Sequence, residues 1–598
     1  MKISQNYFDF DYIMIVDDNT NYSNEKRKII EKNPEKNFLA VTFNHRMFGI
    51  KEKSFIKSEI EYLNLNHLMF SIRPSLSKIL KIKYKKNTRH IKNFLQFYYS
   101  IIIASTYDIK NIILSSNFKE NLELEENYKI NIFKNLNKIK KIFKNKKEKI
   151  TFFNLIDLSK LDKLNFIFLK PSKTTRKNFI KKIPKNEENL FWLGFDSSFK
   201  DVNWNKVYKK DHWSIQAKNS GYGKPLFKNT KYCNRCCIPE TWEGIEFDEY
   251  NICKICRLSE EKMNIDWSKR GEQLKKILKS FKNIKNNNYD CLLPISGGKD
   301  STFQSYILTK IHNVNPLCIT HGQNWMSLTG RYNLENCLQK FDLDHLIFIP
   351  SRKIVNNVAK KSVYQIGDAC WHCHVGIGSF SIQTSINWSL KLIVYGEAPA
   401  DTDARGQHKK LNKVSPYRFL EESAIKNSSD FVDKQFNQKK LSHWSYPPKN
   451  KVKSNGTSII HLGQYIFWDE HKNIDLVTKE FGWKNFKVEN TYKGYKSVEC
   501  VMAGVHDYFN FIKRGIGRAT VHASEDVRRG LIKGINLDDS IDSIVNFNPI
   551  VAPPGTEINS VKEIMSINSI NQLPVIDKNK KSQGLHILKD FIKTKNIS

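Results

Sequence analysis

The sequence predicts an α/β protein with a parallel sheet that occurs twice in the chain. Three observations lead to this fold class. The apolar run Cys291-Leu292-Leu293 has the length of a strand and leads into a glycine-rich turn and then a helix-like pattern. Similar segments recur in the same order at a nearly constant spacing, which indicates an internal duplication. Apolar runs and alternation support strands at the repeated positions independently.

The repeat consists of four pairs of similar segments. DYIMIVDDNTNYS begins at Asp11 and DCLLPISGGKDS begins at Asp290, an offset of 279 residues (290 − 11). FLAVTFNHRMF (38–48) resembles PLCITHGQNWM (316–326), and YLNLNHLMF (62–70) resembles KFDLDHLIF (340–348), both at an offset of 278 (316 − 38, 340 − 62). YDIKNIIL (107–114) resembles WSLKLIVY (388–395) at an offset of 281 (388 − 107). We therefore expect strands of a first copy near 11–16, 38–43, 67–71 and 111–115.

The turn of the second copy, PISGGKDSTF at 294–303, has the composition of an anion-binding site. Its two glycines let the backbone approach a ligand closely. Hydroxyl groups flank the glycines, and Lys299 adds a positive charge. Free N–H groups and the helix dipole both point at such a strand–turn–helix junction. The Walker pattern does not fit, because Leu293 stands where its first glycine should be and Asp300 follows the lysine.

The corresponding turn of the first copy has lost this chemistry. It reads Asp17-Asp18-Asn19-Thr20-Asn21 where the second copy has Ser296 to Asp300. Two carboxylates would repel a triphosphate, and no glycine remains to admit one. We expect the first copy to bind no nucleotide and to serve packing, partner docking or substrate choice.

Composition sets limits on partners. The chain has 598 residues, enough for three or four domains, and its 97 Lys and Arg against 61 acids give a net charge of +36. Such charge is typical of proteins with a polyanionic partner such as tRNA. However, Lys, Asn and Ile are abundant everywhere, and the Lys run at 138–150 has apolar residues at helical spacing, which indicates a solvated helix face. We therefore do not expect a nucleic-acid partner.

The sequence gives no sign of export or membrane insertion. The start, MKISQNYFDFDYIMIVDD, has an apolar run of only a few residues flanked by Asp, unlike a secretory signal. No stretch approaches the roughly 18 apolar residues of a membrane span. Eleven cysteines, four of them in close pairs before the glycine-rich turn, favour metal binding in a reducing compartment over disulfides. We expect a cytoplasmic protein.

The first two cysteine pairs predict a zinc site. YCNRCCIPETWEGIEFDEYNICKIC contains Cys233-x2-Cys236 and Cys253-x2-Cys256, the spacing of a tetrahedral site with four thiolate ligands. Cys237 is a spare or alternative ligand. A closed site of this kind stabilises a small module and leaves no open position for catalysis.

A third pair, Cys370-x2-Cys373 in GDACWHCHVGI, lies beside His372 and His374. Metal binding, a redox role and simple packing of small apolar side chains are all open for this pair. The sequence shows no obvious third ligand that would complete an iron–sulfur cluster site.

The remaining segments complete the expected organisation. Residues 1–150 form the degenerate first copy, 151–230 a connecting region of unknown role, 231–260 the four-cysteine module and 261–535 the second copy with its extensions. Residues 540–598 resemble a single CBS motif, on the basis of Pro549, the Pro-Pro-Gly turn at 553–555, Pro574-Val575-Ile576-Asp577 and Gly584. CBS motifs normally occur in pairs, so nucleotide sensing, pairing with a partner and an unrelated α/β cap all stay open.

The SGGKDS turn resembles the PP-loop of the ATP pyrophosphatase superfamily, which implies a Rossmann-like sheet. Within that superfamily, the order of elements resembles the N-acetyl sugar amidotransferases over about 231–535. The four-cysteine segment is followed by IDWSKRGEQLKKIL (265–278), the loop, GDACWHCH, IVYGEAPA, LGQYIFWDEHKN (462–473) and GIGRATVHASEDVRRG (515–530). The resemblance implies an AMP-forming ligase that converts a sugar acetamido group into an acetamidino group. It implies precursors of O-antigen lipopolysaccharide, or of the pseudaminic or legionaminic acids of flagella, as nucleotide-linked or free sugars.

The resemblance also implies roles for particular residues and partners. Lys299, Asp300 and Glu397 are the candidate catalytic residues, and ammonia would come from a separate glutaminase subunit. ATP with Mg²⁺ would be bound by Ser296, Gly297, Gly298, Lys299, Asp300, Ser301, Thr302 and Gly396. The candidate substrate contacts are Arg518, His522, Asp526 and Arg528.

Two other functions fit parts of the sequence. A tRNA-modifying enzyme could transfer sulfur through Cys370 and Cys373 and use the basic charge, although no tRNA-binding domain is recognisable. A catalytically inactive scaffold could recruit the glutaminase, but the intact SGGKDS turn argues against it.

Overall fold

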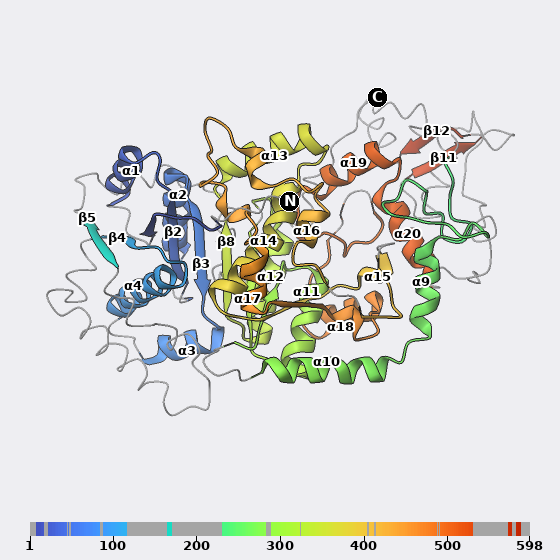
Figure 1. Ribbon diagram of the computed structural model, residues 1–598, viewed down its shortest axis with the longest axis horizontal. Coiled ribbons are helices and arrows are strands. Elements are labelled where there is room, and N and C mark those ends of the chain that lie inside the picture. Colours follow the sequence, from blue (N-terminus) through green and yellow to red (C-terminus); the bar gives the residue numbers. More distant parts are fainter. Residues whose placement is uncertain are drawn as a thin grey trace, which may run out of the picture. The chain divides into compact units, whose positions relative to one another are not determined.

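The fold is described from a computed structural model of the chain (Figure 1). The described residues are 7–16, 22–44, 46, 50–83, 88–115, 164–169, 230–282, 289–322, 324–402, 406–411, 414–486, 488, 491–529, 572–576 and 582–587. The chain divides into two compact units. Unit 1 comprises Met1–Leu226, Asn264–Pro399 and Gly406–Ala519; unit 2 comprises Phe227–Met263, Ala400–Arg405 and Thr520–Ser598.

Unit 1 is built on one ten-stranded sheet with the order β10-β9-β6-β7-β8-β3-β2-β1-β4-β5. Neighbouring strands are parallel except for β3 and β8, which are antiparallel. The strands, in sheet order, are β10 (Ser458–His461), β9 (Leu392–Tyr395), β6 (Cys291–Pro294), β7 (Pro316–His321), β8 (His345–Ile349), β3 (Asn66–Ser71), β2 (Phe38–Asn44), β1 (Tyr12–Ile15), β4 (Asn111–Ser115) and β5 (Asn165–Leu169). The expected α/β class with a mostly parallel sheet is confirmed.

The two halves of the sheet have the same strand order and meet at β3 and β8 (Figure 1). Met69 pairs with Ile347, its own counterpart at the offset of 278 (347 − 69). On either side of that pair, His67 pairs with Ile349 and Ser71 pairs with His345. Since His345 and Ile349 are the counterparts of His67 and Ser71, the register of the two strands is symmetric about the Met69–Ile347 pair. The strands expected near 11–16, 38–43, 67–71 and 111–115 are present as β1 to β4.

The helices follow the same spacing. Helix α12 (Leu328–Phe341) begins and ends 278 residues after α2 (Ile50–Leu63), since 328 − 50 and 341 − 63 both equal 278. Helix α13 (Arg352–Ile366) begins 278 residues after α3 (Pro74–Lys83), since 352 − 74 = 278. Helices α1 (Ser23–Lys32) and α11 (Lys299–Tyr306) each follow the first strand of their half, and α4 (Thr88–Thr106) and α14 (Trp371–Asn387) each precede the fourth.

A buried polar contact is repeated in both halves. His67 Nε2 lies 3.0 Å from Thr42 Oγ1, which donates to the carbonyl of Val16. In the second half, His345 Nε2 lies 2.8 Å from Thr320 Oγ1, which donates to the carbonyl of Ile295. Burial lowers the pKa of both histidines to about 3, so both rings are neutral near pH 7.

Other equivalent positions have diverged. In the first half, Lys26 Nζ pairs with Glu59 at 3.1 Å, and both side chains are buried. At the corresponding positions of the second half, Cys337 and Ser305 make a small neutral contact at 3.4 Å. At these equivalent positions, the first half therefore has a buried ion pair where the second half has a neutral contact.

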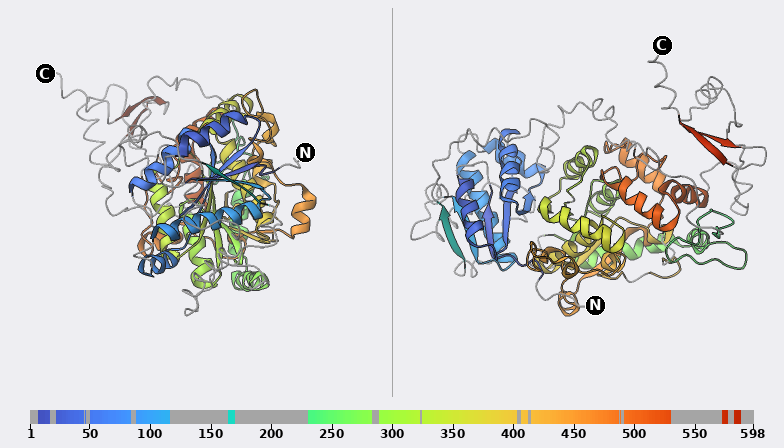
Figure 2. Two further views of the ribbon diagram at one scale, coloured as in Figure 1. Left: turned by 90° about the vertical axis from the view of Figure 1, so that its left-hand side faces the viewer. Right: turned by 90° about the horizontal axis from the view of Figure 1, so that it is seen from above.

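Helices cover both faces of the sheet (Figure 2). On one face, α4 and α14 contribute to a single hydrophobic cluster that extends across both halves. On the other face, α1 and α2 cover the first half, whereas α10 (Trp267–Phe281), α11 and α12 cover the second. A continuous core on one face explains why the two halves form one unit.

Polar contacts reinforce the junction of the two halves. The Arg73 guanidinium pairs with Asp344 at 2.7 Å, and Ser351 N donates to Asn66 Oδ1 at 2.8 Å. The Arg46 side chain forms an ion pair with Glu335 of α12, and both groups are almost fully buried. Breaking one of these pairs would leave a buried charge without its partner.

Several expectations concern residues outside the described ranges. These are the degenerate turn at 17–21, the basic helix at 138–150 and the first part of the CBS-like segment, with Pro549 and the turn at 553–555. Strand β5 lies within 151–230, the segment to which the sequence assigned no role, and extends the first half of the sheet. In the last segment, β11 (Gln572–Ile576) and β12 (Ser582–Ile587) pair antiparallel. Of the described helices, none has the length and apolar character to span a membrane.

Candidate functional site

The glycine-rich turn connects β6 to α11 in a conformation that its glycines make possible. Gly297 has φ +86°, and a Cβ there would lie 2.3 Å from the carbonyl oxygen of Gly330. The carbonyl of Gly297 accepts a hydrogen bond of 3.0 Å from Trp483 Nε1. The hydroxyls of Ser301 and Thr302 both donate to the carbonyl of Gly298. The turn is therefore fixed by its own hydroxyls and by a distant tryptophan.

Lys299 is the first residue of α11 and is 7% exposed. Its Nζ lies 2.5 Å from Asp300 Oδ2 and 3.0 Å from Glu470 Oε1. Burial alone would lower the pKa of Lys299, but these two carboxylates outweigh burial and raise it above its ordinary value. The ammonium group is therefore held charged and in place at the helix N-terminus, where anions bind.

Glu470 begins α18 (Glu470–Lys479) and joins further lysines to this site. It is 3% exposed, and its carboxylate lies 2.6 Å from Lys496 Nζ and 3.9 Å from Lys493 Nζ. No sequence motif pointed to these three residues. Glu470 lies within the segment LGQYIFWDEHKN, which was noted only for its resemblance, so its role could have been suspected there.

A second carboxylate lies against the glycines of the turn. A Cβ at Gly298 would lie 3.5 Å from Glu499 Oε1, and Ser327 N donates to the Glu499 carbonyl at 2.9 Å. Burial raises the pKa of Glu499, although Lys299 opposes the shift. No sequence signal pointed to Glu499, because it comes from a segment about two hundred residues after the turn.

The end of β9 lies close to α11 at Gly396. A Cβ at this position would lie 2.6 Å from Gln304 Oε1 and 2.9 Å from the Asp300 carbonyl, so glycine permits the close approach. The next residue, Glu397, pairs with Arg418 at 2.8 Å and lies 3.6 Å from His461. Burial would raise the pKa of Glu397, but the positive charge of Arg418 lowers it overall. Glu397 is thus an ionised carboxylate at the edge of the sheet where the turn lies.

The four candidate substrate contacts all lie on α20 (Arg518–Arg528). Arg518 Nε pairs with Asp507 at 2.6 Å within unit 1. His522 and Asp526 are buried in unit 2. Arg528 donates from Nη1 to Cys236 Sγ at 3.4 Å and is 7% exposed, so it belongs to the four-cysteine module.

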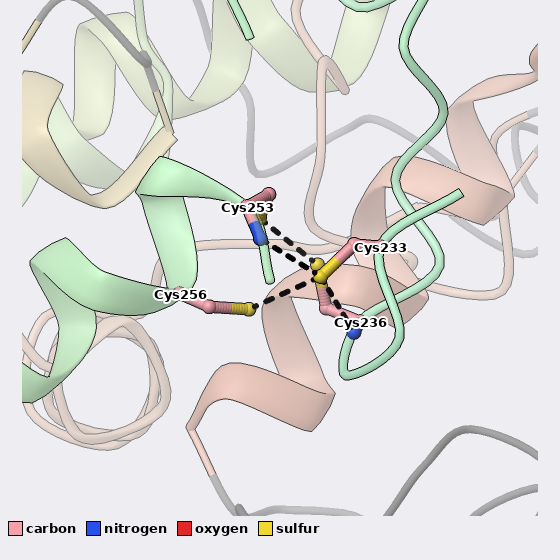
Figure 3. A group of neighbouring side chains, drawn as sticks. All are labelled: Cys233, Cys236, Cys253 and Cys256. Atoms are coloured by element: carbon pink, nitrogen blue, oxygen red, sulfur yellow. Dashed lines mark hydrogen bonds between the residues drawn. The ribbon is translucent and has the colours of Figure 1, made fainter. Parts of the chain in front are cut away.

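The four cysteines predicted to bind zinc lie together in unit 2 (Figure 3). Cys233 Sγ lies 3.9 Å from Cys256 Sγ, and Cys236 Sγ lies 3.6 Å from Cys253 Sγ. A tetrahedral zinc ion with Zn–S bonds of about 2.3 Å places its sulfur ligands about 3.8 Å apart, so the geometry fits zinc.

The surroundings of Cys233 favour its thiolate form. The backbone N–H groups of Arg235, Cys236 and Cys253 donate to Cys233 Sγ. Hydrogen bonds with the other three thiols lower the pKa of Cys233 far below its ordinary value. Cys237 has φ +57° and lies outside the group of four ligands. Ile238, Ile255 and Val527 pack around the cluster, so the module has a small apolar core of its own.

The third cysteine pair lies at the start of α14 in unit 1. Cys370 precedes the helix, Cys373 lies in its first turn, and the thiol of Cys500 is close enough to raise the pKa of both, after the larger effect of burial. Asp368, Cys370 and His506 also group together. The sequence shows no third residue beside this pair, because Cys500 and His506 lie more than a hundred residues further along.

No protein-family model matches the chain. An uncharacterized protein of Methanocaldococcus jannaschii is 24% identical over 204 residues, which is 33% of this chain and 72% of that protein. The chain is similar to that protein, whose name assigns it no activity.

Proposed function

We propose that this protein is an ATP-dependent, AMP-forming amidotransferase that converts the acetamido group of a sugar into an acetamidino group. The observation that carries the proposal is Lys299, which lies buried between Asp300 and Glu470 where a glycine turn enters a helix. A fixed cation and the N–H groups of the helix N-terminus would then both stabilise an anion bound at the turn. This combination suits a departing pyrophosphate.

The reaction would proceed in two steps. The acetamide oxygen attacks the α-phosphorus of ATP, a P–O bond forms, and the bond to the bridging oxygen breaks so that pyrophosphate leaves with its electron pair. Ammonia then adds to the carbon of the adenylylated imidate and loses its extra protons. AMP leaves with the C–O electron pair, and nitrogen replaces oxygen. Lys299 would stabilise the charge that develops on the β-phosphate.

The lysines around Glu470 extend this stabilisation. Lys496 and Lys493 share the Glu470 carboxylate with Lys299, which also pairs with Asp300. These ammonium groups would stabilise a bound polyphosphate. Asp300 Oδ1 is buried and has no hydrogen-bond partner among the described residues, which suits it to a cation. Mg²⁺ bound with ATP would supply further neutralisation of phosphate charge.

The rest of the proposal follows from the resemblance. Zinc held by the four-cysteine cluster would stabilise unit 2 and take no part in the reaction. Ammonia would come from a separate glutaminase, and the sugar would be a precursor of a bacterial surface polysaccharide or of a flagellar nonulosonic acid. ATP as substrate and a set of free cysteines suit a cytoplasmic enzyme.

A direct assay tests the proposal. The protein is incubated with ATP, ammonium and a nucleotide-linked N-acetyl sugar, and products are followed by AMP release and mass spectrometry. We expect AMP together with a sugar in which NH replaces one oxygen, and neither product from Lys299→Ala. ATP turnover to ADP alone would reject the proposed chemistry.

A second function is favoured by one observation. The thiols of Cys370, Cys373 and Cys500 lie near one another, as a sulfur-transferring tRNA enzyme with an iron–sulfur cluster would require. Incubation with unmodified tRNA, ATP and sulfide, followed by nucleoside analysis, would show thiolated nucleosides if this function is correct.

A further inference from the structure

A cluster of mixed metal ligands lies outside the residues of the proposed reaction. Asp368 and Cys370 come from the turn between α13 and α14, and His506 comes from α19 (Ala503–Arg514). One ligand atom from each residue lies within 4.8 Å of the others. His506 Nδ1 lies 3.0 Å from Asp368 Oδ1, a separation that suits either a hydrogen bond or two ligands of one ion.

We propose that Asp368, Cys370 and His506 form a second metal site, for a divalent transition ion such as Zn²⁺. Thiolate, imidazole and carboxylate are the three ligand types that zinc accepts in proteins. Three protein ligands leave a fourth tetrahedral position for water or another small ligand, unlike the closed four-cysteine cluster in unit 2. The two centres would therefore differ in chemistry as well as in place.

Neighbouring groups hold two of the ligands in position. The backbone N–H of Cys370 donates to Asp368 Oδ1 at 3.0 Å, and the Asn510 side chain lies 3.0 Å from His506 Nε2. The atom of Asn510 at this distance is its amide nitrogen Nδ2. When Nδ1 binds a metal, Nε2 carries the proton, and the Asn510 amide would turn so that its oxygen accepts it.

The surroundings of the cluster are rich in groups that carry negative charge when ionised. Cys373 and Cys500 lie near Cys370 but outside the group of three ligands. Cys500 directly follows Glu499, whose carboxylate lies against the glycine turn. A residue near the proposed metal site is therefore the sequence neighbour of a carboxylate at the glycine turn.

Metal content tests this proposal without reference to enzymatic activity. Purified full-length protein, loaded with Zn²⁺ and then freed of excess metal, should hold two ions per chain, one for each ligand group. His506→Ala and Asp368→Asn should each lower the content to one, while the matched control His312→Ala keeps two. Cys253→Ser should remove the other ion. One ion in the wild-type chain, or two in both His506→Ala and Asp368→Asn, would overturn the proposal.

Cobalt substitution identifies the ligands. Co²⁺ in the wild-type chain should give thiolate charge-transfer bands from both sites, and Cys370→Ser should remove one set while Cys337→Ala removes none. Circular dichroism would confirm that each variant is folded, and His506→Ala provides the same test if Cys370→Ser does not fold. Bound iron that depends on Cys370, Cys373 and Cys500 but not on His506 would instead indicate an iron–sulfur cluster and overturn this ligand set. Either result is independent of whether the protein makes an amidine.

Discussion

At the scale of single residues, the site depends on how one buried ammonium group is held. Burial disfavours a charged lysine, but Asp300 and Glu470 lie 2.5 and 3.0 Å from Lys299 Nζ and raise its pKa. The group therefore stays protonated across the physiological pH range. Lys493 and Lys496 share Glu470 with it, so a phosphate that enters the site meets a preorganised set of charges.

Replacing Lys299 by alanine tests this role. We expect AMP formation to fall by roughly 100-fold or more, because a preorganised charge acts most strongly on the charge that develops in the transition state. The rate is measured by AMP release under saturating ATP. Lys310→Ala, in the π-helical segment Ile307–Ile311 that follows α11, is the control and should keep the wild-type rate. A Lys299→Ala variant with wild-type turnover would exclude the PP-loop assignment.

At the scale of elements, the four-cysteine module connects metal binding to folding. Its apolar core is small, so the thiolate ligands contribute much of what holds the segment together. Cys253→Ser should lower the zinc content by one ion per chain and lower the melting temperature. Metal analysis and thermal unfolding check both effects, and Cys237→Ser is the control because Cys237 lies outside the ligand group. An unchanged melting curve in zinc-free protein would contradict this role.

The junction of the two halves offers a second test at this scale. Arg46 and Glu335 form an ion pair whose side chains are 1% and 2% exposed. Glu335→Gln should lower the free energy of unfolding by about 3–5 kcal/mol, because it leaves the Arg46 charge buried without its partner. Urea unfolding measures the change.

The exposed pair Arg27–Glu31 in α1 provides the comparison, since both of its side chains lie largely in solvent. Glu31→Gln should cost no more than about 0.5 kcal/mol. Equal effects from the two substitutions would mean that the Arg46–Glu335 pair does not stabilise the junction.

At the scale of the whole molecule, the positions of individual strands could be predicted from the sequence, but the pairing between the two halves of the sheet could not. The first four strands lie where the repeat placed them, because each is an apolar run that survives divergence. The antiparallel pairing of β3 with β8 could not be predicted, since it depends on two strand edges matching in register. Glu470, Lys496 and Glu499 were missed for a related reason. These residues are far from the turn in the sequence, and only the folding of the chain brings them close to it. A single charged residue also belongs to no periodic pattern that would mark it in a sequence.

The origin of the ammonia concerns the whole chain, because a glutaminase would be a separate domain or subunit. We expect ammonium salts to support amidine formation by the purified protein, and glutamine to do so only after a glutaminase is added. Product formation with each nitrogen source measures this directly. Glutamine-dependent turnover by the pure chain would show that it contains a glutaminase activity of its own.

The last prediction concerns how many nucleotides one chain binds. Two halves with the same strand order would suggest two sites, but the turn of the first half contains Asp17 and Asp18 where the second has Ser296 and Gly297. One carboxylate beside a phosphate charge costs on the order of 4 kcal/mol at a separation of about 4 Å and an effective dielectric of about 20.

Two such repulsions exceed what the remaining contacts of that turn are expected to offset. Titration calorimetry with a non-hydrolysable ATP analogue should therefore give one nucleotide per chain. The Lys299→Ala variant should weaken that single site, whereas Asp17→Asn should leave it unchanged. A stoichiometry of two, or binding that persists at full strength in Lys299→Ala, would mean that the first half has kept a nucleotide site. Its role would then have to be sought in nucleotide binding rather than in packing against β8 or docking a partner.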